Sequence, residues 1–600
     1  MKKYFRYMGM GILMLTLATF SSCTKHFLDE VPAESFTLDS IFTNRDYAEA
    51  ALTTVYNMLP QDQLYLSPFG AMAFTGSADE MEMPWPEKYN VTMIAGAWNP
   101  SDGPVADYWN NNYNGIRKAN VFLENIAKTP MTAAEKSRWI AETHFLRAFF
   151  YFNLVRLYGP VPLIDHVIST SEDFTQYKRA TLEDLVTFMV HDIDTAASIL
   201  PMNYTADKDG RVTRAACLAL KSRLLLYMAS PLFNGNPDYA NVRDKDGIAL
   251  FPLVYSSDKW QKAAEAAKAC IDQSEASGYR LYEAAGGDPE KSYQELFLTP
   301  WNSEVLFARN ESNTWDANDL NRTAFPNGMG GWGGYSATQE LVDAYQMANG
   351  DDPINGYGSD GAPIINAGSG YQETGFATED GKYWQKGIRN AYTNREPRFY
   401  ASINYNGAWF NGRRIEFWLN GLDGMAAHGR DHCVTGYLMK KFVDSTINIP
   451  QGKWVTTTWI YFRLGEIYLN YAEALNEVQG AVTDVYKYMN AIRTRAGLPH
   501  LPAGLSKENM REKIHHERRI EMAFEMQRYF DCHRWKISPT VDRGPKHGMN
   551  ISVGNSISDE AFYKRVVTSN RVFVAPKHYL WPVPQGEIDK NKNLVQNIGW

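Results

Sequence analysis

The chain has 600 residues, of which 21% are charged and 44% are hydrophobic, proportions that are typical of a folded globular protein. The formal net charge is −8, which argues against nucleic acid as a partner, because nucleic-acid-binding proteins carry a basic stripe. A chain of this length can bury a large core, and its length alone would allow two to four domains.

The first 22 residues have the pattern of a cleaved signal peptide of the lipoprotein type. Lys2, Lys3 and Arg6 form a positively charged region, and an uncharged apolar stretch follows over residues 8–20. That stretch is too short to span a bilayer as a helix. Small residues then precede Cys23, as in a bacterial lipobox, so we predict that Cys23 is acylated and anchors the mature protein in a membrane. The alternative is an ordinary signal peptide followed by an unrelated cysteine.

Segments with helical periodicity dominate the rest of the chain. Between residues 133 and 158, large apolar residues recur at spacings of three and four, which predicts one helix with a broad apolar face. Thr181 and Asp184 form a capping pattern at the start of a second predicted helix over residues 181–200. Further amphipathic helices are predicted over residues 213–229, 258–276, 460–478, 483–496 and 507–535.

The predicted helices come in antiparallel pairs that long insertions separate. No regular 34-residue repeat is present, so we predict a mainly α protein with a degenerate tetratricopeptide-like helical scaffold. Within one body over residues 23–600, we expect this scaffold to occupy the segments at about 33–60, 110–280 and 456–600.

The segments at about 60–107 and 280–455 have a different character. Glycines cluster there, for example at five positions between 328 and 334, and helical periodicity is lost apart from a short stretch at 338–345. Long loops within a compact domain usually carry function. We therefore predict a large loop-rich, irregular half with a few short strands, and we expect this half to face a ligand.

The sequence contains no convincing metal site. His428, His432 and the adjacent Cys433 have a spacing that would bind zinc on a helix, but Gly424 and Gly429 favour a loop. Two Asp-Lys-Asp-Gly segments, at 207–210 and 244–247, begin like calcium loops but lack the third oxygen ligand. We predict no cofactor and leave structural calcium open. The remaining cysteines, Cys217, Cys270 and Cys532, are far apart, and we predict no obligatory disulfide.

The last third of the chain carries the motifs that identify a family. Residues 461–474, 492–498 and 580–584, together with Glu517-Arg-Arg-Ile-Glu-Met-Ala-Phe-Glu525, resemble the C-terminal motifs of SusD/RagB proteins. Within the predicted 507–535 helix, Arg518–Glu521 and Glu525–Arg528 are i,i+3 pairs that would stabilise an exposed helix, and we interpret the helix as a structural spine. Met526 departs from the family, which often has glycine or another small residue there.

The resemblance implies a function as well as a fold. SusD/RagB proteins are non-catalytic lipoproteins of the bacterial outer membrane that face the cell exterior. They capture a nutrient, often a glycan, and cap a SusC-like TonB-dependent transporter, which takes the cargo inward. We therefore expect a glycan ligand, a SusC-like partner, a lipid anchor and no enzymatic activity.

In that family, bound glycan contacts an N-terminal loop after a Ser-x-Asp-Glu-like motif and a mid-chain loop. Here these correspond to the segments at about 77–98 and 315–335. A sugar binder needs exposed aromatic faces with polar side chains at their edges. The alternative for each tryptophan is that it merely fills its own loop. We predict Trp98 and Trp332 as stacking platforms, Trp85, Trp315 and Tyr335 as further aromatic contacts, and Asp79 and Arg322 as polar contacts at the rim.

Two other functions remain open from the sequence. A surface glycoside hydrolase would need two carboxylates across one glycosidic bond, and the adjacent pair Asp351–Asp352 rarely has the required separation. A SusD-like binder of peptide or another nutrient would keep the fold and change the cargo. The loop aromatics favour glycan over peptide.

Overall fold

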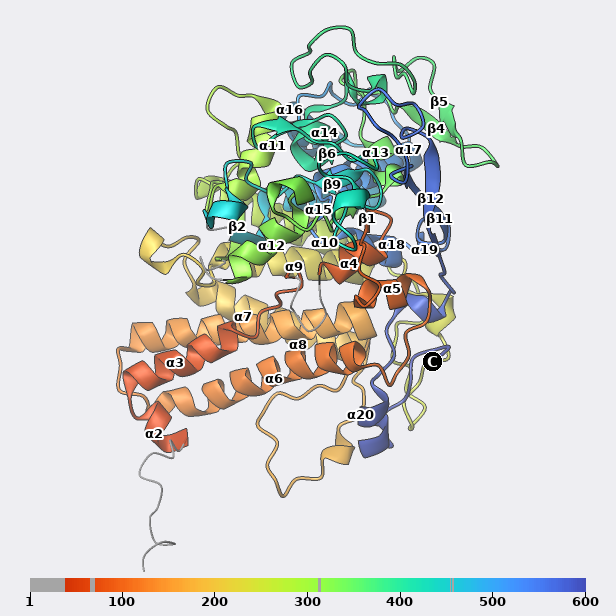
Figure 1. Cartoon of the computed structure of the whole chain (residues 1–600). Coiled ribbons are helices and arrows are strands. Elements are labelled where there is room, and N and C mark those ends of the chain that lie inside the picture. Colours follow the sequence, from red (N-terminus) through yellow and green to blue (C-terminus); the bar gives the residue numbers. More distant parts are fainter. Residues whose placement is uncertain (1–37, 65–70, 311–314, 454, 456–457) are drawn as a thin grey trace, which may run out of the picture.

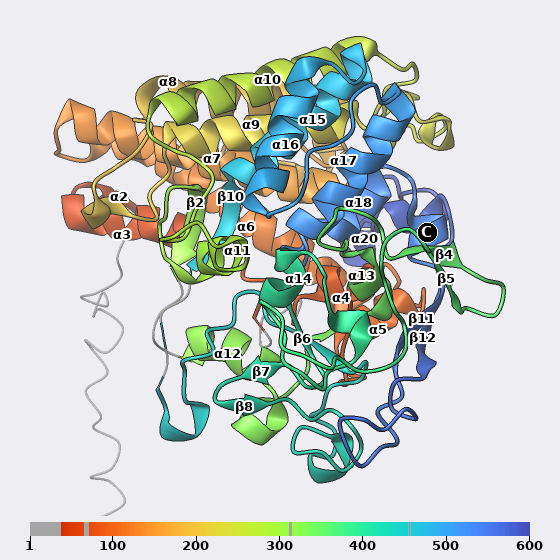
Figure 2. The same cartoon turned by 90° about the horizontal axis from the view of Figure 1, so that it is seen from above.

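The computed structural model describes residues 38–64, 71–310, 315–453, 455 and 458–600. Long helices form one half of the molecule and loops with short strands form the other (Figures 1 and 2). The prediction of a mainly α protein with an irregular, loop-rich half is confirmed. The signal peptide and Cys23 lie outside the described residues. Within these residues, no helix combines the length and apolarity needed to cross a membrane.

The helical half is a series of neighbouring antiparallel helices. Each helix from α6 to α10 packs against the next, α10 packs against α15, and α15 packs against both α16 and α17. Figure 1 shows α3, α6 and α7 together at the base of this series. The helices are α2 (Leu38–Phe42), α3 (Arg45–Tyr56), α6 (Gly103–Asn125), α7 (Ala133–Tyr158), α8 (Leu182–Ile199), α9 (Arg214–Ala229), α10 (Ser257–Ala276), α15 (Leu464–Gln479), α16 (Thr483–Arg495) and α17 (Lys507–Glu521).

Local sequence signals set the ends of several of these helices. The Thr132 side chain caps α7 by accepting a hydrogen bond from the Glu135 N–H, and Gly159, with φ at 71°, ends that helix. Thr181 caps α8 through the Asp184 N–H, as the capping pattern predicted. The predicted helices over 133–158, 181–200, 213–229, 258–276 and 483–496 are confirmed to within one or two residues.

Strands are short and concentrate in the loop-rich half. Its central sheet has the antiparallel order β1-β3-β9-β6, and the other strands pair two by two as β2–β10, β4–β5, β7–β8 and β11–β12. The strands are β1 (Met81–Glu82), β2 (Val305–Asn310), β3 (Ser336–Ala337), β4 (Ile354–Tyr357), β5 (Pro363–Ile365), β6 (Ile403–Tyr405), β7 (Trp409–Phe410), β8 (Arg413–Arg414), β9 (Tyr437–Met439), β10 (Thr458–Arg463), β11 (Gly544–Met549) and β12 (Arg565–Arg571).

Short helices complete the loop-rich half and the C-terminal segment. Among them α13 occupies the stretch at 338–345 for which the sequence predicted helical periodicity. They are α4 (Ala73–Ser77), α5 (Tyr89–Ile94), α11 (Pro289–Leu298), α12 (Trp315–Ala324), α13 (Gln339–Ala344), α14 (Pro397–Ser402), α18 (Arg528–Arg534), α19 (Ser538–Val541) and α20 (Gln585–Lys590).

Two predicted helices are wrong in part. The helix expected over 460–478 begins only at Leu464, because residues 458–463 form β10 and pair with β2. The helix expected over 507–535 ends at Glu521 and resumes as α18, and Phe524 and Met526 between them have φ values of 62° and 56°. A left-handed backbone favours glycine, which gives a physical reason for the glycine that the family often has at position 526.

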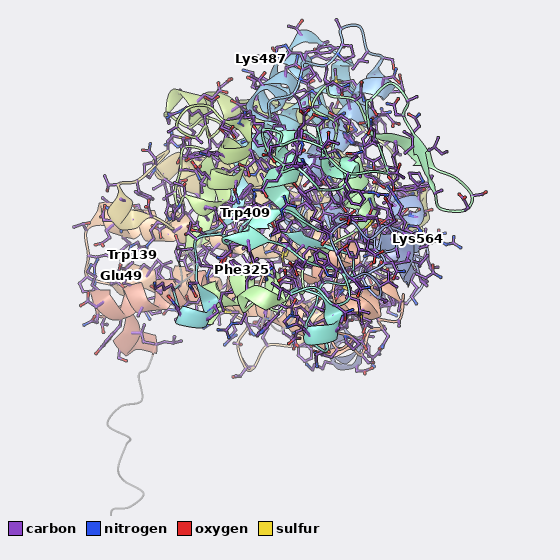
Figure 3. The ribbon with its side chains drawn as sticks, turned by 45° about the horizontal axis from the view of Figure 1, so that its top comes forward. Glu49, Trp139, Phe325, Trp409, Lys487 and Lys564 are labelled. Carbon is purple, nitrogen blue, oxygen red and sulfur yellow. The ribbon has the colours of Figure 1, made fainter. Side chains whose placement is uncertain are left out.

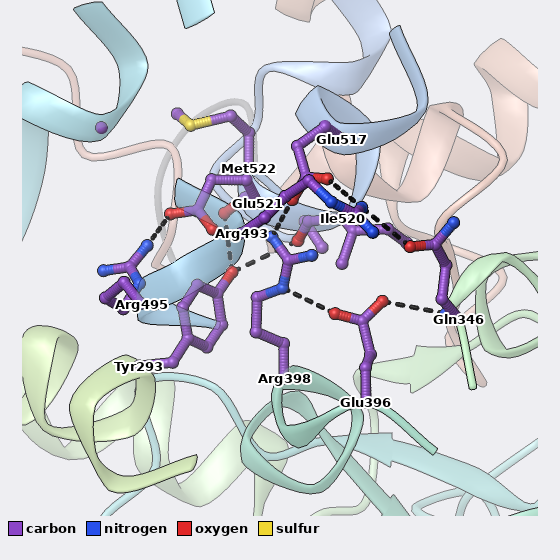
Figure 4. Close-up of polar contacts among 12 residues, drawn as sticks. Tyr293, Gln346, Glu396, Arg398, Arg493, Arg495, Glu517, Ile520, Glu521 and Met522 are labelled. Carbon is purple, nitrogen blue, oxygen red and sulfur yellow. Dashed lines mark hydrogen bonds and ion pairs between the residues drawn. The ribbon is translucent and has the colours of Figure 1, made fainter. Parts of the chain in front are cut away.

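A buried network of charged side chains joins the helical half to the loop-rich half (Figure 4). Glu521 on α17 accepts hydrogen bonds from Arg463, Arg495 and Arg398. Glu517, one turn earlier, pairs with Arg398 and Arg493. The network contains five carboxylates and five cations, none more than 7% exposed: Glu304, Glu396, Glu517, Glu521, Glu525, Arg398, Lys441, Arg463, Arg493 and Arg495.

The same network explains the break after α17. The Lys441 ammonium group donates to the carbonyls of Glu521 and Ala523, and the Arg463 guanidinium also donates to the Glu521 carbonyl. These carbonyls therefore bind cations instead of continuing the helix. The predicted i,i+3 pairs do not form in this structure: Arg518 pairs with Asp531, and the other three side chains pair with distant partners.

Candidate functional site

The predicted mid-chain contact Trp332 lies within a glycine-rich segment, between Gly331 and Gly333, and is partly exposed. Its ring lies 6.3 Å from the ring of Trp85 at an interplanar angle of 82°. The Arg322 guanidinium lies over the Trp332 ring, 5.8 Å from its centroid, within the range of a cation–π contact. Three of the predicted residues, Trp85, Arg322 and Trp332, are therefore in one cluster.

The glycines around Trp332 are required by close packing. A Cβ atom at Gly334 would lie 1.7 Å from the Trp85 ring, and one at Gly331 would lie 2.1 Å from the Phe325 carbonyl oxygen. The Gly334 N–H donates to the Thr323 carbonyl at 2.8 Å. The segment that the sequence marks as a loop therefore wraps tightly over Trp85 and fixes where Trp332 emerges.

The expectation that Trp85, Trp98 and Tyr335 face solvent is wrong. Trp85 is 1% exposed and its Nε1–H donates to Asp431 at 2.8 Å. Tyr335 is fully buried and its hydroxyl donates to the Gln63 carbonyl. Trp98 is 4% exposed, with its ring centroid 4.2 Å from that of His578 and 5.4 Å from that of Trp600. Segments distant in the sequence cover all three rings, so in this conformation none offers a face to a sugar.

The predicted rim contact Asp79 is also buried. It is 3% exposed and forms ion pairs with Arg528 at 2.7 Å and Arg519 at 2.8 Å. Burial raises the pKa of this carboxyl, but the two arginines outweigh burial and hold the pKa below its usual range. Asp79 thus acts in a structural ion pair here. Trp315 opens α12, and its side chain lies outside the described residues.

Glu80, the second acid of the Ser-x-Asp-Glu-like motif, has the opposite electrostatic character. It is fully buried, and neither carboxyl oxygen has a hydrogen-bond partner among the described residues. Burial, together with the neighbouring Asp79 charge, raises the pKa of Glu80 from 4.5 to about 8. At neutral pH the folded protein therefore keeps this proton, whereas the unfolded chain releases it.

In a Glu80→Gln variant, the free energy of unfolding should depend less on pH than in the wild-type protein. Between pH 4.5 and 8 the folded state holds a proton that the unfolded state has lost, so the free energy of unfolding falls as pH rises. The variant should flatten this fall by up to about 1.4 kcal/mol per pH unit. Urea unfolding at pH 5, 6, 7 and 8 measures this slope, and Glu265→Gln, at an exposed position of α10, is the control. An unchanged slope contradicts the protonation assignment.

The residues that looked like metal ligands have other partners. His428 and His432 lie in a loop, as their flanking glycines predicted, and their rings contact the carbonyls of Leu422 and Gly429. Asp244 of the second calcium-like segment pairs with Lys178 at 2.8 Å and accepts from backbone N–H groups. The four cysteines of the described chain, at 217, 270, 433 and 532, are free and buried.

Sequence reasoning missed one further group of aromatic side chains. Tyr383 and Trp384 are partly exposed, and Trp409 is 58% exposed. They lie within the loop-rich segment 280–455, among glycine, asparagine and aspartate residues. The criterion that selected Trp332 would therefore have selected them too.

Comparison with known proteins gives consistent results over both halves of the chain. The sequence model described as "SusD family" matches residues 303–600, and the model described as "Starch-binding associating with outer membrane" matches residues 26–226. These two matches contain the C-terminal motifs and the N-terminal loop with its Ser-x-Asp-Glu-like segment.

Individual relatives agree with these matches. SusD-like protein P2 of Formosa agariphila is 23% identical over 100% of this chain and 99% of the relative. Starch-binding protein SusD of Bacteroides thetaiotaomicron is 23% identical over 87% of this chain and 83% of the relative. The crystal structure of a SusD-like protein from Bacteroides fragilis is 28% identical, with a TM-score of 0.74 over 94% of this chain and 98% of that one. The chain therefore belongs to the SusD family.

Proposed function

We propose that this protein is a non-catalytic glycan-binding protein of the cell surface. The observation that carries the proposal is the partly exposed Trp332 ring, which Trp85 and Arg322 hold in the mid-chain loop that contacts glycan in the family. The starch-binding description of the model that matches residues 26–226 supports glycan as the ligand class.

The proposed physiological role is delivery of the glycan to a SusC-like TonB-dependent transporter in the outer membrane. Acyl chains on Cys23 would tether the protein to the outer face of that membrane. The outer-membrane association in the description of the matching model supports this location. The net charge of −8 argues against adhesion to an anionic membrane surface by charge alone and favours a lipid tether.

The glycan-binding proposal is tested by affinity electrophoresis. Native gels containing amylopectin, laminarin, xylan or arabinogalactan should retard the wild-type protein in at least one case. Trp332→Ala should weaken that retardation by about tenfold, because each 1.4 kcal/mol of lost contact is a factor of ten in affinity. Tyr47→Ala removes an aromatic ring that is 45% exposed on α3 and serves as the control. Equal retardation of both variants contradicts the assignment of Trp332.

A surface glycoside hydrolase remains the competing function. Two carboxylates of a pocket of about 530 Å³, Glu340 and Asp343, are already paired, Glu340 with His547 at 2.7 Å and Asp343 with Arg565. Glycoside hydrolysis needs one carboxyl to protonate the leaving group and a second carboxylate to activate water or attack the sugar, and the pairings with His547 and Arg565 occupy both side chains. The two functions are distinguished by measuring reducing ends released from the polysaccharide that retards the protein. Retardation without release supports the binding function, and release overturns it.

A further inference from the structure

A pocket of about 440 Å³ opens in the loop-rich half and has no lining residue in common with the Trp85–Arg322–Trp332 cluster. It is formed by the segment at 380–385, by α14 and β6, and by β7. Its volume falls within the roughly 300–1,000 Å³ typical of small-molecule sites. The aromatic lining consists of Tyr383, Trp384, Tyr400, Tyr405 and Trp409.

The aromatic rings of this pocket divide into a buried base and an exposed wall. Tyr400 and Tyr405 are 4% and 3% exposed and form the base. Trp384 lies 6.2 Å from the ring of Tyr400 at an angle of 23°, so the two rings are nearly parallel. Trp409 on β7 is 58% exposed. Exposed flat rings over a supported base are suited to the apolar face of a sugar ring.

The segment that carries the wall is fixed by its own contacts. The Gly381 N–H donates to the Trp384 carbonyl at 2.9 Å, and a Cβ atom at position 381 would lie 2.0 Å from the Trp384 ring. The Tyr383 hydroxyl donates to Asp288 at 3.2 Å. Because these contacts already hold Tyr383 and Trp384 in place, the two side chains would lose little conformational entropy when a ligand binds.

Asn404 gives an independent sign that the pocket receives a polar ligand. This side chain is 1% exposed and lines the pocket, and its Nδ2 atom has no hydrogen-bond partner among the described residues. A buried donor without an acceptor is destabilising. Because the Nδ2 atom is itself buried, the Asn404 amide must turn toward the pocket, and a sugar hydroxyl there would then supply the missing acceptor. A purely apolar ligand would leave the donor unsatisfied.

A short series of packing contacts through Phe410 and Phe325 links the pocket to the Trp332 cluster. The rings of Phe325 and Phe410 are 4.9 Å apart, Trp409 is adjacent to Phe410 on β7, and Gly331 beside Trp332 packs against Phe325. Figure 3 shows Trp409 and Phe325 close together on one side of the molecule. A single glycan chain of sufficient length could therefore contact both places.

We propose that the pocket lined by Trp384, Trp409 and Asn404 is a second saccharide-binding subsite, which takes one or two sugar units of a longer glycan. The inference rests on the proposed glycan function. Two linked subsites raise the overall affinity for a long chain, because binding at one increases the local concentration at the other. Short oligosaccharides, in contrast, should occupy the two subsites independently.

The test uses the full-length mature protein and a trisaccharide or tetrasaccharide made from the polysaccharide that retards it. Isothermal titration calorimetry should give two binding sites for the wild-type protein and one each for Trp384→Ala and Trp332→Ala. On the polysaccharide gel, Trp384→Ala and Trp409→Ala should each weaken retardation by roughly tenfold. Tyr255→Ala, which removes a ring that is likewise 58% exposed but belongs to the helical half, should have no effect.

Asn404→Ala separates binding from folding. The loss of an unsatisfied buried donor offsets part of the cost of the small cavity that alanine leaves, so the unfolding midpoint should change little, whereas oligosaccharide affinity at this subsite should fall several-fold. One wild-type binding site together with unchanged retardation of Trp384→Ala and Trp409→Ala overturns the second subsite and leaves the proposed function standing. Failure of every glycan to retard the wild-type protein overturns both.

Discussion

Replacing Glu521 by alanine is expected to lower the free energy of unfolding by about 3–5 kcal/mol, the usual cost of removing one partner from a buried ion pair. The Glu521 carboxylate accepts from Arg463 at 2.8 Å, from Arg398 at 2.9 Å and also from Arg495. All four side chains are at most 4% exposed. Loss of the Glu521 carboxylate leaves the positive charge of three buried guanidinium groups only partly compensated.

Urea unfolding followed by circular dichroism measures this effect, and Asp272→Asn is the matched control. Asp272 pairs with Lys268 at 2.6 Å on the surface of α10, where its side chain is 55% exposed. An exposed i,i+4 pair contributes only about 0.3–0.5 kcal/mol. If Glu521→Ala lowers the free energy of unfolding by as little as the control does, the buried network does not stabilise the fold in the way proposed.

The pH dependence of the network has a defined sign. Burial raises the pKa of Glu521, but attraction to Arg495, Arg463 and Arg398 is stronger and holds this pKa well below its usual value of 4.5. The stabilisation is therefore fully present above pH 4.5 and is lost as pH falls toward the folded-state pKa. Removal of Glu521 should accordingly make the acid unfolding of the protein shallower.

Replacing Asp79 by alanine is expected to cost about 3–5 kcal/mol of stability for the same reason. Arg528, which is 6% exposed, and Arg519 would both lose the carboxylate that neutralises them. The sequence predicted Asp79 as a rim contact to glycan, whereas the structure places it in a buried ion pair. The two roles have separable consequences, because a rim contact affects affinity and a buried pair affects folding.

Thermal unfolding and affinity electrophoresis on the same Asp79→Ala sample distinguish the two roles. The unfolding temperature should fall, while the fraction that stays folded at low temperature should be retarded by glycan like the wild type. Glu87→Ala is the control within the same N-terminal loop, since Glu87 and Arg430 form an exposed ion pair worth at most about 1 kcal/mol. If the unfolding temperature is unchanged and retardation by glycan is lost, Asp79 contacts the ligand and has no structural role.

The amino-acid sequence by itself determined the long helices and the family. Amphipathic periodicity and local caps such as Thr132 and Thr181 fix α7 and α8, because both signals act over a few residues of the same helix. The family motifs could likewise be recognised from short stretches of sequence. The sequence also marked one unusual backbone position. Met526 departs from the small residues of the family, and its φ of 56° is a left-handed conformation that is rare for residues other than glycine.

Only the tertiary structure decided which side chains meet and which face water. β10 is a strand because β2 is available as its partner, and Arg518 leaves its i,i+3 neighbour because Asp531 is buried beside it. Trp98 is buried because Trp600 and His578 come from the far end of the chain. Exposure depends on such long-range packing, and similar local composition surrounds Trp332 and Trp409, which reach solvent, and Trp85 and Trp98, which do not. For this reason the sequence predicted a loop-rich half with candidate aromatic contacts, while only the folded protein separated the exposed rings from the buried ones.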